Sequence, residues 1–222
     1  GAVGSMVGQI AKIHGCRAVG IAGQVAVGAV MPGIDDPVLH ARGLEHGGVV
    51  PEPGSNRRSD RWGGIFENRI RFPLEIVRKV RQRVGPEFII IYRLSMLDLV
   101  TGGSSWQEVV QLAKQVEAAE ATIINTGIGW HEARVPTIAA MVPRGGFSWV
   151  TQRLMGEVEI PLVATNRINM PEVAEKVLAD GCSDMVSMAR PFLADPDWVK
   201  KAKTGREKET SSFLQAQGRM QD

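Results

Sequence analysis

The sequence predicts an α/β fold built on a parallel β-sheet, either a segment of a barrel or an open doubly wound sheet. Short apolar runs rich in β-branched residues recur between residues 88 and 189, and helical patterns separate them. Such a continuous run is typical of a strand that is buried on both faces. Strands that alternate with helices form crossovers in a parallel sheet, where ligands bind beyond the carboxyl ends of the strands.

Each element follows from a local pattern. The expected strands are residues 88–95, 121–127, 161–165 and 184–189. The first helix follows the spacing of Ile70, Leu74, Val77, Val80 and Val84 and stops at Gly85-Pro86. The next begins at a capping box of Ser105 and Glu108, and a weaker one covers residues 148–156. Asn169 is the expected cap of a helix that ends near Gly181, and Asp195 the cap of the last.

The composition excludes several classes of protein. The 222 residues are 44% hydrophobic and 23% charged, as in ordinary globular proteins. Lys and Arg number 26 against 24 Asp and Glu, so the net charge of +2 disfavours a dedicated nucleic-acid binder. No apolar stretch approaches the ~20 residues that span a bilayer, and the start does not resemble a signal peptide. Two cysteines form neither a disulfide framework nor a zinc site, so we expect a cytoplasmic protein without a metal.

Arginine follows three of the four expected strands. Its planar guanidinium carries five donors and suits phosphate or ring carbonyl oxygens. The three residues are Arg93, Arg167 and Arg190. Like charges at one sheet edge repel unless an anion or acidic side chains lie between them. The alternative to a ligand is therefore a set of structural ion pairs with Asp98, Glu132 or Asp184.

Two further features admit both a functional and a structural interpretation. His131, in the loop after the second strand, can donate a proton near neutral pH or be an ordinary solvated side chain. The opening glycines Gly1, Gly4 and Gly8 allow a turn around a pyrophosphate or an ordinary packing turn. The remaining histidines have no metal-binding spacing.

Several long motifs follow one another between residues 56 and 205. Residues 58–64 read RSDRWGG and residues 67–72 read ENRIRF. The later motifs are YRLSMLDL, TIINTGIGWHEARVPTIA, PRGGFSWVT, TNRIN and DMVSMARPFLAD. The first two resemble the signature of the old yellow enzyme-like flavin oxidoreductases, and the later ones resemble the NADPH-dependent 2,4-dienoyl-CoA reductases within that family.

The resemblance implies a partial TIM barrel of about four C-terminal βα units that binds FMN, with NADPH as electron donor. By this resemblance Arg93 faces the pyrimidine side of the flavin, and His131 hydrogen-bonds the substrate and assists its protonation. The residues implied at the FMN phosphate and its surroundings are Asn166, Arg167, Met188, Ala189 and Arg190. The implied substrate is an unsaturated acyl-CoA or an enone.

The sequence departs from that family in several places. It has no counterpart of the first four barrel strands, the catalytic tyrosine, the cluster-binding cysteines or the NADPH-binding half, so no iron–sulfur cluster is expected. Residues 1–24 instead resemble the nucleotide-binding segment of quinone oxidoreductase-like medium-chain dehydrogenases, as in a chimera. The expected organisation is an atypical N-terminal segment (1–55), a half-barrel (56–205) and a polar tail (206–222).

Three functions stay open at this point: a flavin-dependent reductase, a half-barrel that binds FMN or phosphate without turnover, and a scaffold without a ligand. Half a barrel exposes the edges of its sheet, so we expect self-association as a symmetric homodimer. Neither a nucleic acid nor a membrane is an expected partner.

Overall fold

The sheet contains five parallel strands that lie side by side in chain order. The computed structural model describes residues 19–22, 56–129, 133–134 and 136–209, the first range as backbone only. The strands are β1 (Val19–Ala22), β2 (Ile90–Leu97), β3 (Ile123–Ile128), β4 (Leu162–Ala164) and β5 (Met185–Val186). The order never reverses, whereas a doubly wound sheet reverses at a switch point. The strand order therefore confirms the expected barrel segment, and it decides between the two architectures left open by the sequence.

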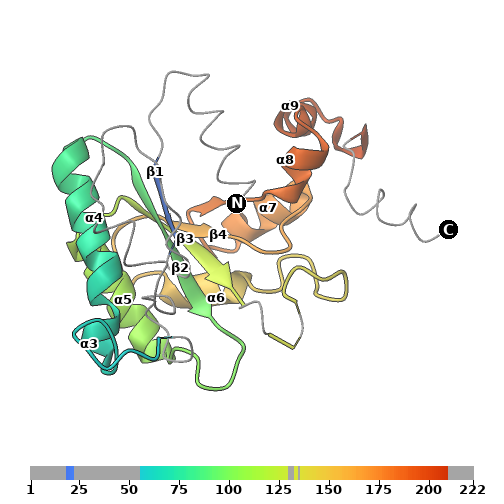
Figure 1. Cartoon of the computed structure of the whole chain (residues 1–222). Helices are drawn as coiled ribbons and strands as arrows, with labels where there is room; N and C mark the ends of the chain where they lie inside the picture. Colours follow the sequence, from blue (N-terminus) through green and yellow to red (C-terminus); the bar gives the residue numbers. More distant parts are fainter. Residues whose placement is uncertain (1–18, 23–55, 130–132, 135, 210–222) are drawn as a thin grey trace.

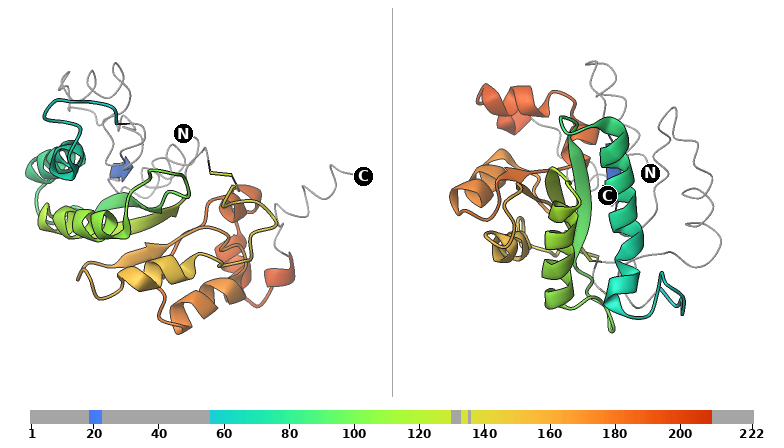
Figure 2. Two further views of the ribbon diagram at one scale, coloured as in Figure 1. Left: turned by 90° about the horizontal axis from the view of Figure 1, so that it is seen from below. Right: turned by 90° about the vertical axis from the view of Figure 1, so that its left-hand side faces the viewer.

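Helices connect successive strands and lie along the outer side of the sheet, as Figures 1 and 2 show. The connecting helices are α4 (Arg71–Val84), α5 (Trp106–Ala118), α6 (Ser148–Leu154) and α7 (Pro171–Ala179). Short elements flank them: α3 (Phe66–Arg69), α8 (Arg190–Ala194), α9 (Trp198–Lys203) and the 3-10 helix η1 (Glu207–Glu209). Among the described helices, none is long and apolar enough to cross a membrane.

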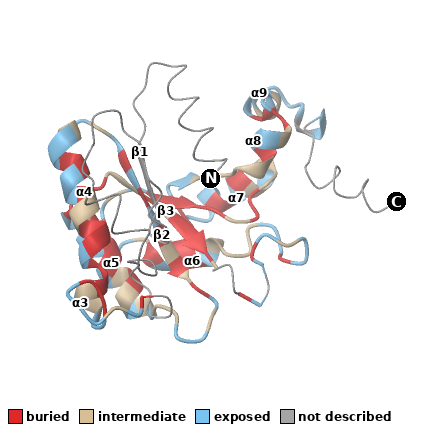
Figure 3. Ribbon diagram, in the orientation of Figure 1, coloured by how far each residue is buried: buried red, intermediate tan, exposed pale blue. Residues whose placement is uncertain are grey.

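The core lies between the sheet and these helices (Figure 3). In β2 the even-numbered side chains, including Tyr92 and Leu94, are buried against α4 and α5, while Ile91 and Arg93 are exposed on the opposite face. Buried and exposed residues alternate along β2 because successive side chains of a strand point to opposite faces of the sheet. The second face is the inner side of the barrel segment, and it carries the polar residues described below.

Local sequence explains where α5 and α7 begin. The Ser105 hydroxyl accepts a hydrogen bond from the Glu108 amide, and the Glu108 carboxylate accepts one from the Ser105 amide, so the predicted capping box is present. The predicted cap of α7 by Asn169 is wrong. Met170 is the N-cap residue without a side-chain hydrogen bond, because Pro171 opens the helix and fixes its first turn.

The end of the chain differs from prediction in its details. α9 begins at Trp198 with Asp197 as N-cap residue, two positions after the predicted cap, although the Asp195 carboxylate accepts from the Asp197 amide at 3.0 Å. β5 contains only two residues where six were predicted, and α8 was not predicted. Within residues 1–55 the structure describes only β1, which pairs in parallel with β2, so the expectations for the rest of 1–55 and for 210–222 lie outside the described residues.

Candidate functional site

A row of polar side chains crosses the inner face of the sheet from β2 to the residue after β5. Arg93 on β2 is the register partner of Asn125 on β3, and its Nη1 donates to Asn125 Oδ1 at 3.0 Å. Asn125 Nδ2 in turn donates to Ser187 Oγ at 3.3 Å. The row joins strands that are not neighbours in the sheet and fixes the direction of the Arg93 guanidinium.

Gly127 makes room for that guanidinium near the carboxyl end of β3. A Cβ atom at this position would lie 3.4 Å from Arg93 Nη2 and 3.5 Å from Arg93 Cζ. The Arg93 side chain is exposed, yet desolvation by the surrounding sheet lowers the pKa of its guanidinium. Arginine nevertheless stays charged at neutral pH.

Arg167 is buried immediately after β4, and two backbone carbonyls fix it. Its Nε donates to the Val142 carbonyl at 2.9 Å and its Nη2 to the Ala140 carbonyl at 3.4 Å. Asn166 and Arg167 both have positive φ angles, of 70° and 58°, in the left-handed region that non-glycine residues seldom adopt. This strained turn points the Arg167 side chain under the loop that joins β3 to α6.

Two more arginines surround Arg167. Arg190, the first residue of α8, donates from Nη1 to the Ile138 carbonyl at 3.3 Å. Burial lowers the pKa of Arg167, and the positive charges of Arg190 and Arg144 lower it further. Within the described part of the chain, none of these three guanidiniums pairs with a carboxylate. The three residues, Arg144, Arg167 and Arg190, are called the arginine cluster below.

The acidic residues that could have neutralised the arginines have other partners. The Asp98 carboxylate accepts from Ser95 Oγ and from the Ser104 amide, both at 2.7 Å. The Asp184 carboxylate accepts from the Leu162 amide at 2.8 Å, at the amino end of β4. Glu132 lies outside the described residues. The described carboxylates thus leave Arg93 and the arginine cluster available for an external anion.

Asn166 fastens the end of β4 to the loop that follows β3. Its Nδ2 donates to Thr137 Oγ1 at 2.8 Å and to the Ile128 carbonyl at 3.3 Å, and its Oδ1 accepts from Thr165 Oγ at 2.7 Å. Because these contacts use both amide hydrogens, the Asn166 side chain has no donor left for a flavin. The side chain has a structural role that the sequence did not reveal.

The other predicted site residues fall into two groups. Met188 and Ala189 lie between β5 and Arg190, and Met188 packs against the small core cluster around Ala164. His131 lies outside the described residues, so its catalytic role stays a prediction. Within the described ranges, no group of three His, Cys, Asp or Glu side chains has the arrangement of a metal site.

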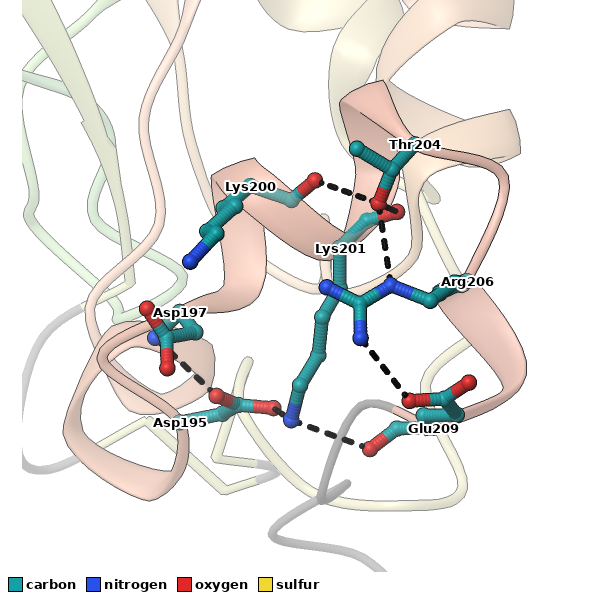
Figure 4. A network of polar contacts seen from close by, with 7 residues as sticks. All are labelled: Asp195, Asp197, Lys200, Lys201, Thr204, Arg206 and Glu209. Atoms are coloured by element: carbon teal, nitrogen blue, oxygen red, sulfur yellow. Dashed lines mark hydrogen bonds and ion pairs between the residues drawn. The ribbon is translucent and has the colours of Figure 1, made fainter.

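A polar network joins Asp195, the residue after α8, to α9 and η1 (Figure 4). Lys201 Nζ donates to the buried Asp195 carboxylate at 2.7 Å and to the Glu209 carbonyl at 3.2 Å. Arg206 links Thr204 to Glu209 in the same network. The network therefore stabilises the segment that follows α8.

Sequence reasoning placed Gly127 at the end of its strand without assigning it a role, and it missed Asn125 and Arg144. The strand register could have revealed the roles of Asn125 and Gly127, because they alternate with buried residues of β3 and share the inner face with Arg93. Arg144 lies in a loop, where no periodicity indicates its neighbours.

Comparison with known proteins identifies the family. Residues 51–209 match the NADH:flavin oxidoreductase / NADH oxidase family. An NADH oxidase of Thermoanaerobacter brockii is 37% identical over 189 residues, which are 83% of this chain and 28% of that protein. A metal reductase of Desulforamulus reducens is 38% identical over 153 residues, or 69% of this chain and 23% of that protein.

A solved structure shows the same fold. The 2-naphthoyl-CoA reductase in complex with 2-naphthoyl-CoA superposes with a TM-score of 0.68 and 35% identity, over 71% of this chain and 24% of that one. This chain thus spans about a quarter of the length of the relatives it matches. The family match begins at residue 51, so the medium-chain dehydrogenase resemblance of residues 1–24 stays a prediction. By its sequence match and its fold, the chain belongs to the NADH:flavin oxidoreductase / NADH oxidase family of flavin-dependent oxidoreductases.

Proposed function

We propose that this chain forms the flavin-binding end of an FMN-dependent reductase that uses NADPH to reduce the carbon–carbon double bond of an unsaturated acyl-CoA. The observation that carries the proposal is a set of arginines at the carboxyl side of a barrel sheet, without carboxylate partners among the described residues. The similar 2-naphthoyl-CoA reductase supports an acyl-CoA thioester as substrate.

The residues around Arg93 fit the flavin ring. A guanidinium can donate to the ring carbonyl oxygen and stabilise the negative charge of a reduced ring, because it is cationic and planar. Asn125 orients it and Gly127 leaves space beside it. Arg93 is therefore assigned to the pyrimidine side of FMN.

The phosphate of FMN is assigned to Arg167 and Arg190, with the backbone around Met188 and Ala189. Arg167 uses Nε and Nη2 for carbonyl oxygens, so its Nη1 donors remain for an anion. Arg190 uses only Nη1 in the described structure. A phosphate monoester would neutralise charges that otherwise repel one another.

Bound FMN would supply hydride transfer between NADPH and the substrate. The contribution of the protein is the placement of charge and of one proton. His131 is assigned as the group that hydrogen-bonds the substrate and delivers its proton, because imidazole is the side chain that can give up a proton near neutral pH.

A half-barrel that binds FMN without turnover is the second candidate. The chain spans about a quarter of its relatives, and within the described sheet β1 and β5 pair on one side only. The unpaired edges also support the proposal of a symmetric homodimer. A molar mass of a single chain, measured by light scattering, would contradict this proposal.

Visible absorbance separates these candidates. The chain is incubated with FMN, freed of unbound flavin and scanned, and NADPH is then added without oxygen. If the absorbance of bound flavin is lost on addition of NADPH and returns on addition of a dienoyl-CoA, the reductase is supported. If bound flavin keeps its absorbance after addition of NADPH, the half-barrel that binds FMN without turnover is supported. Protein that retains no flavin contradicts both. An Arg190→Ala variant that binds FMN as well as the parent contradicts the assignment of Arg190 to the phosphate.

A further inference from the structure

The loop around Arg144 is fastened to Arg167 on both sides of Arg144. Two residues before Arg144, the Val142 carbonyl accepts from Arg167 Nε at 2.9 Å. One residue after it, the Gly145 amide donates to the Arg167 carbonyl at 3.1 Å. These contacts keep the Arg144 backbone next to Arg167 and do not depend on where the Arg144 side chain points.

The Arg144 side chain itself is exposed and has no hydrogen bond or ion pair with any described residue. Its charge nevertheless reaches Arg167, since it contributes to lowering the pKa of that guanidinium. Arg167 is buried, Arg190 is partly buried, and Arg144 is the solvent-facing member of the cluster.

Three positive charges held together without a carboxylate are electrostatically unfavourable in the absence of a ligand. A phosphate monoester carries about two negative charges at neutral pH and has three terminal oxygens, enough to receive donors from three guanidiniums. An uncharged ligand gains nothing from such a cluster.

We infer that Arg144 is a specificity-determining residue that contacts the terminal phosphate of the ligand together with Arg167 and Arg190, and so selects a phosphorylated flavin over its unphosphorylated form. The inference rests on the proposed function for the identity of the ligand. The anion site itself can be tested without flavin.

The first experiment uses inorganic phosphate and the unfolding temperature of the purified chain. A ligand that binds only the folded protein raises this temperature. Phosphate is expected to raise it in the parent more than sodium chloride of equal ionic strength, and Arg144→Gln is expected to remove most of the difference. Arg78→Gln is the matched control, because Arg78 is an exposed arginine on α4 and its loss changes the net charge equally.

The second experiment compares FMN with riboflavin by quenching of flavin fluorescence. Arg144→Gln is expected to weaken FMN binding about tenfold, the order of one charge-assisted hydrogen bond, and to change riboflavin binding less than twofold. Arg144→Lys is expected to recover part of the loss, because it restores the charge without the planar donors.

The outcomes separate the two claims. A phosphate effect that depends on Arg144 in a chain that binds no flavin supports the anion site and refutes the proposed function. FMN binding that Arg144→Gln leaves unchanged, or a phosphate effect equal in Arg144→Gln and the parent, overturns the inference for Arg144 and leaves the proposed function standing. Equal losses of FMN and riboflavin also overturn it, since they indicate a general disturbance of the loop.

Discussion

Replacement of Arg81 by methionine is expected to destabilise the fold strongly while leaving the candidate site in place. Arg81 is a buried residue of α4 at the amino end of the strands, and its guanidinium donates to the carbonyl oxygens of Gly85, Pro86, Phe88 and Glu120. Nη2 also donates to Thr122 Oγ1 at 3.1 Å. One side chain thus holds the segments that lead into β2 and β3.

The size of the stability loss follows from the carbonyl oxygens to which methionine cannot donate a hydrogen bond. Four carbonyl oxygens lose their donor in partly buried contacts, and each one that water cannot reach costs about 1–3 kcal/mol. If water replaces the donor at half of them, the free energy of unfolding falls by about 2–6 kcal/mol. That is a large share of the roughly 5–15 kcal/mol that stabilises a typical domain.

Urea denaturation followed by circular dichroism measures this loss. Arg81→Lys is expected to restore less than half of the stability that Arg81→Met loses, because one ammonium group cannot reach both the turn at residues 85–88 and the Glu120 carbonyl. Arg78→Met on the exposed side of the same helix is the control and is expected to stay within about 0.5 kcal/mol of the parent. A loss below about 1 kcal/mol for Arg81→Met would refute the reasoning.

Three further changes test other parts of the structure. Tyr92→Phe is expected to be neutral or stabilising by up to about 1 kcal/mol in urea denaturation, because the buried Tyr92 hydroxyl has no hydrogen-bond partner in the described structure; a loss above 1 kcal/mol would indicate a partner. Gly127→Val is expected to push the Arg93 guanidinium aside and weaken FMN binding about tenfold, whereas Gly127→Ala, whose Cβ lies at ordinary contact distance, costs less than threefold; equal effects in a fluorescence titration would contradict this. Ser105→Ala is expected to lower stability by about 1 kcal/mol. Burial raises the pKa of Glu108, but hydrogen bonds from Ser105 and Arg69 outweigh it and lower the pKa overall. The stabilisation from Glu108 is therefore complete above the pKa that this carboxyl has in the unfolded chain, and it is lost as the pH falls through the lowered pKa of the folded state, which denaturation at several pH values can follow.

The sequence predicted the central strands well because their signal is local and continuous. The apolar run at residues 88–95 became β2, and the run at 121–127 became β3, with ends shifted by one or two residues. β5 is shorter than predicted, and Met185 on its inner face is exposed. An apolar run shows that a segment prefers burial, whereas the length of a strand also depends on the neighbour that pairs with it.

Helix caps show the same limit. The Ser105 cap was predictable because the residues that complete it lie within one turn. Asn169 has the right side chain for a cap, but its Oδ1 is buried without a hydrogen-bond partner in the described structure. Pro171 and the extended Met170 determine where α7 begins, and their backbone geometry outweighs the preference of one side chain.

The site was predictable in outline, since strand ends can be located and arginine stands at three of them. The partners of those arginines were not predictable, because most are backbone carbonyls of a loop, such as those of Ile138, Ala140 and Val142. Every residue has a carbonyl, so the sequence holds no sign of which ones will be used.

Arginines at opposite ends of this sheet differ in how many donors the protein itself consumes. Arg81 uses Nε, Nη1 and Nη2 on internal oxygens, and Arg167 uses Nε and Nη2. Arg190 uses Nη1 alone, and Arg144 donates no hydrogen bond to any described residue. Charge is equal in all four, so charge cannot tell a structural arginine from a ligand-binding one. The number of N–H donors that the protein leaves unused does distinguish them. That number is smallest at the amino end of the strands, where Arg81 stabilises the fold, and larger at the carboxyl end, where barrels of this architecture bind their ligands.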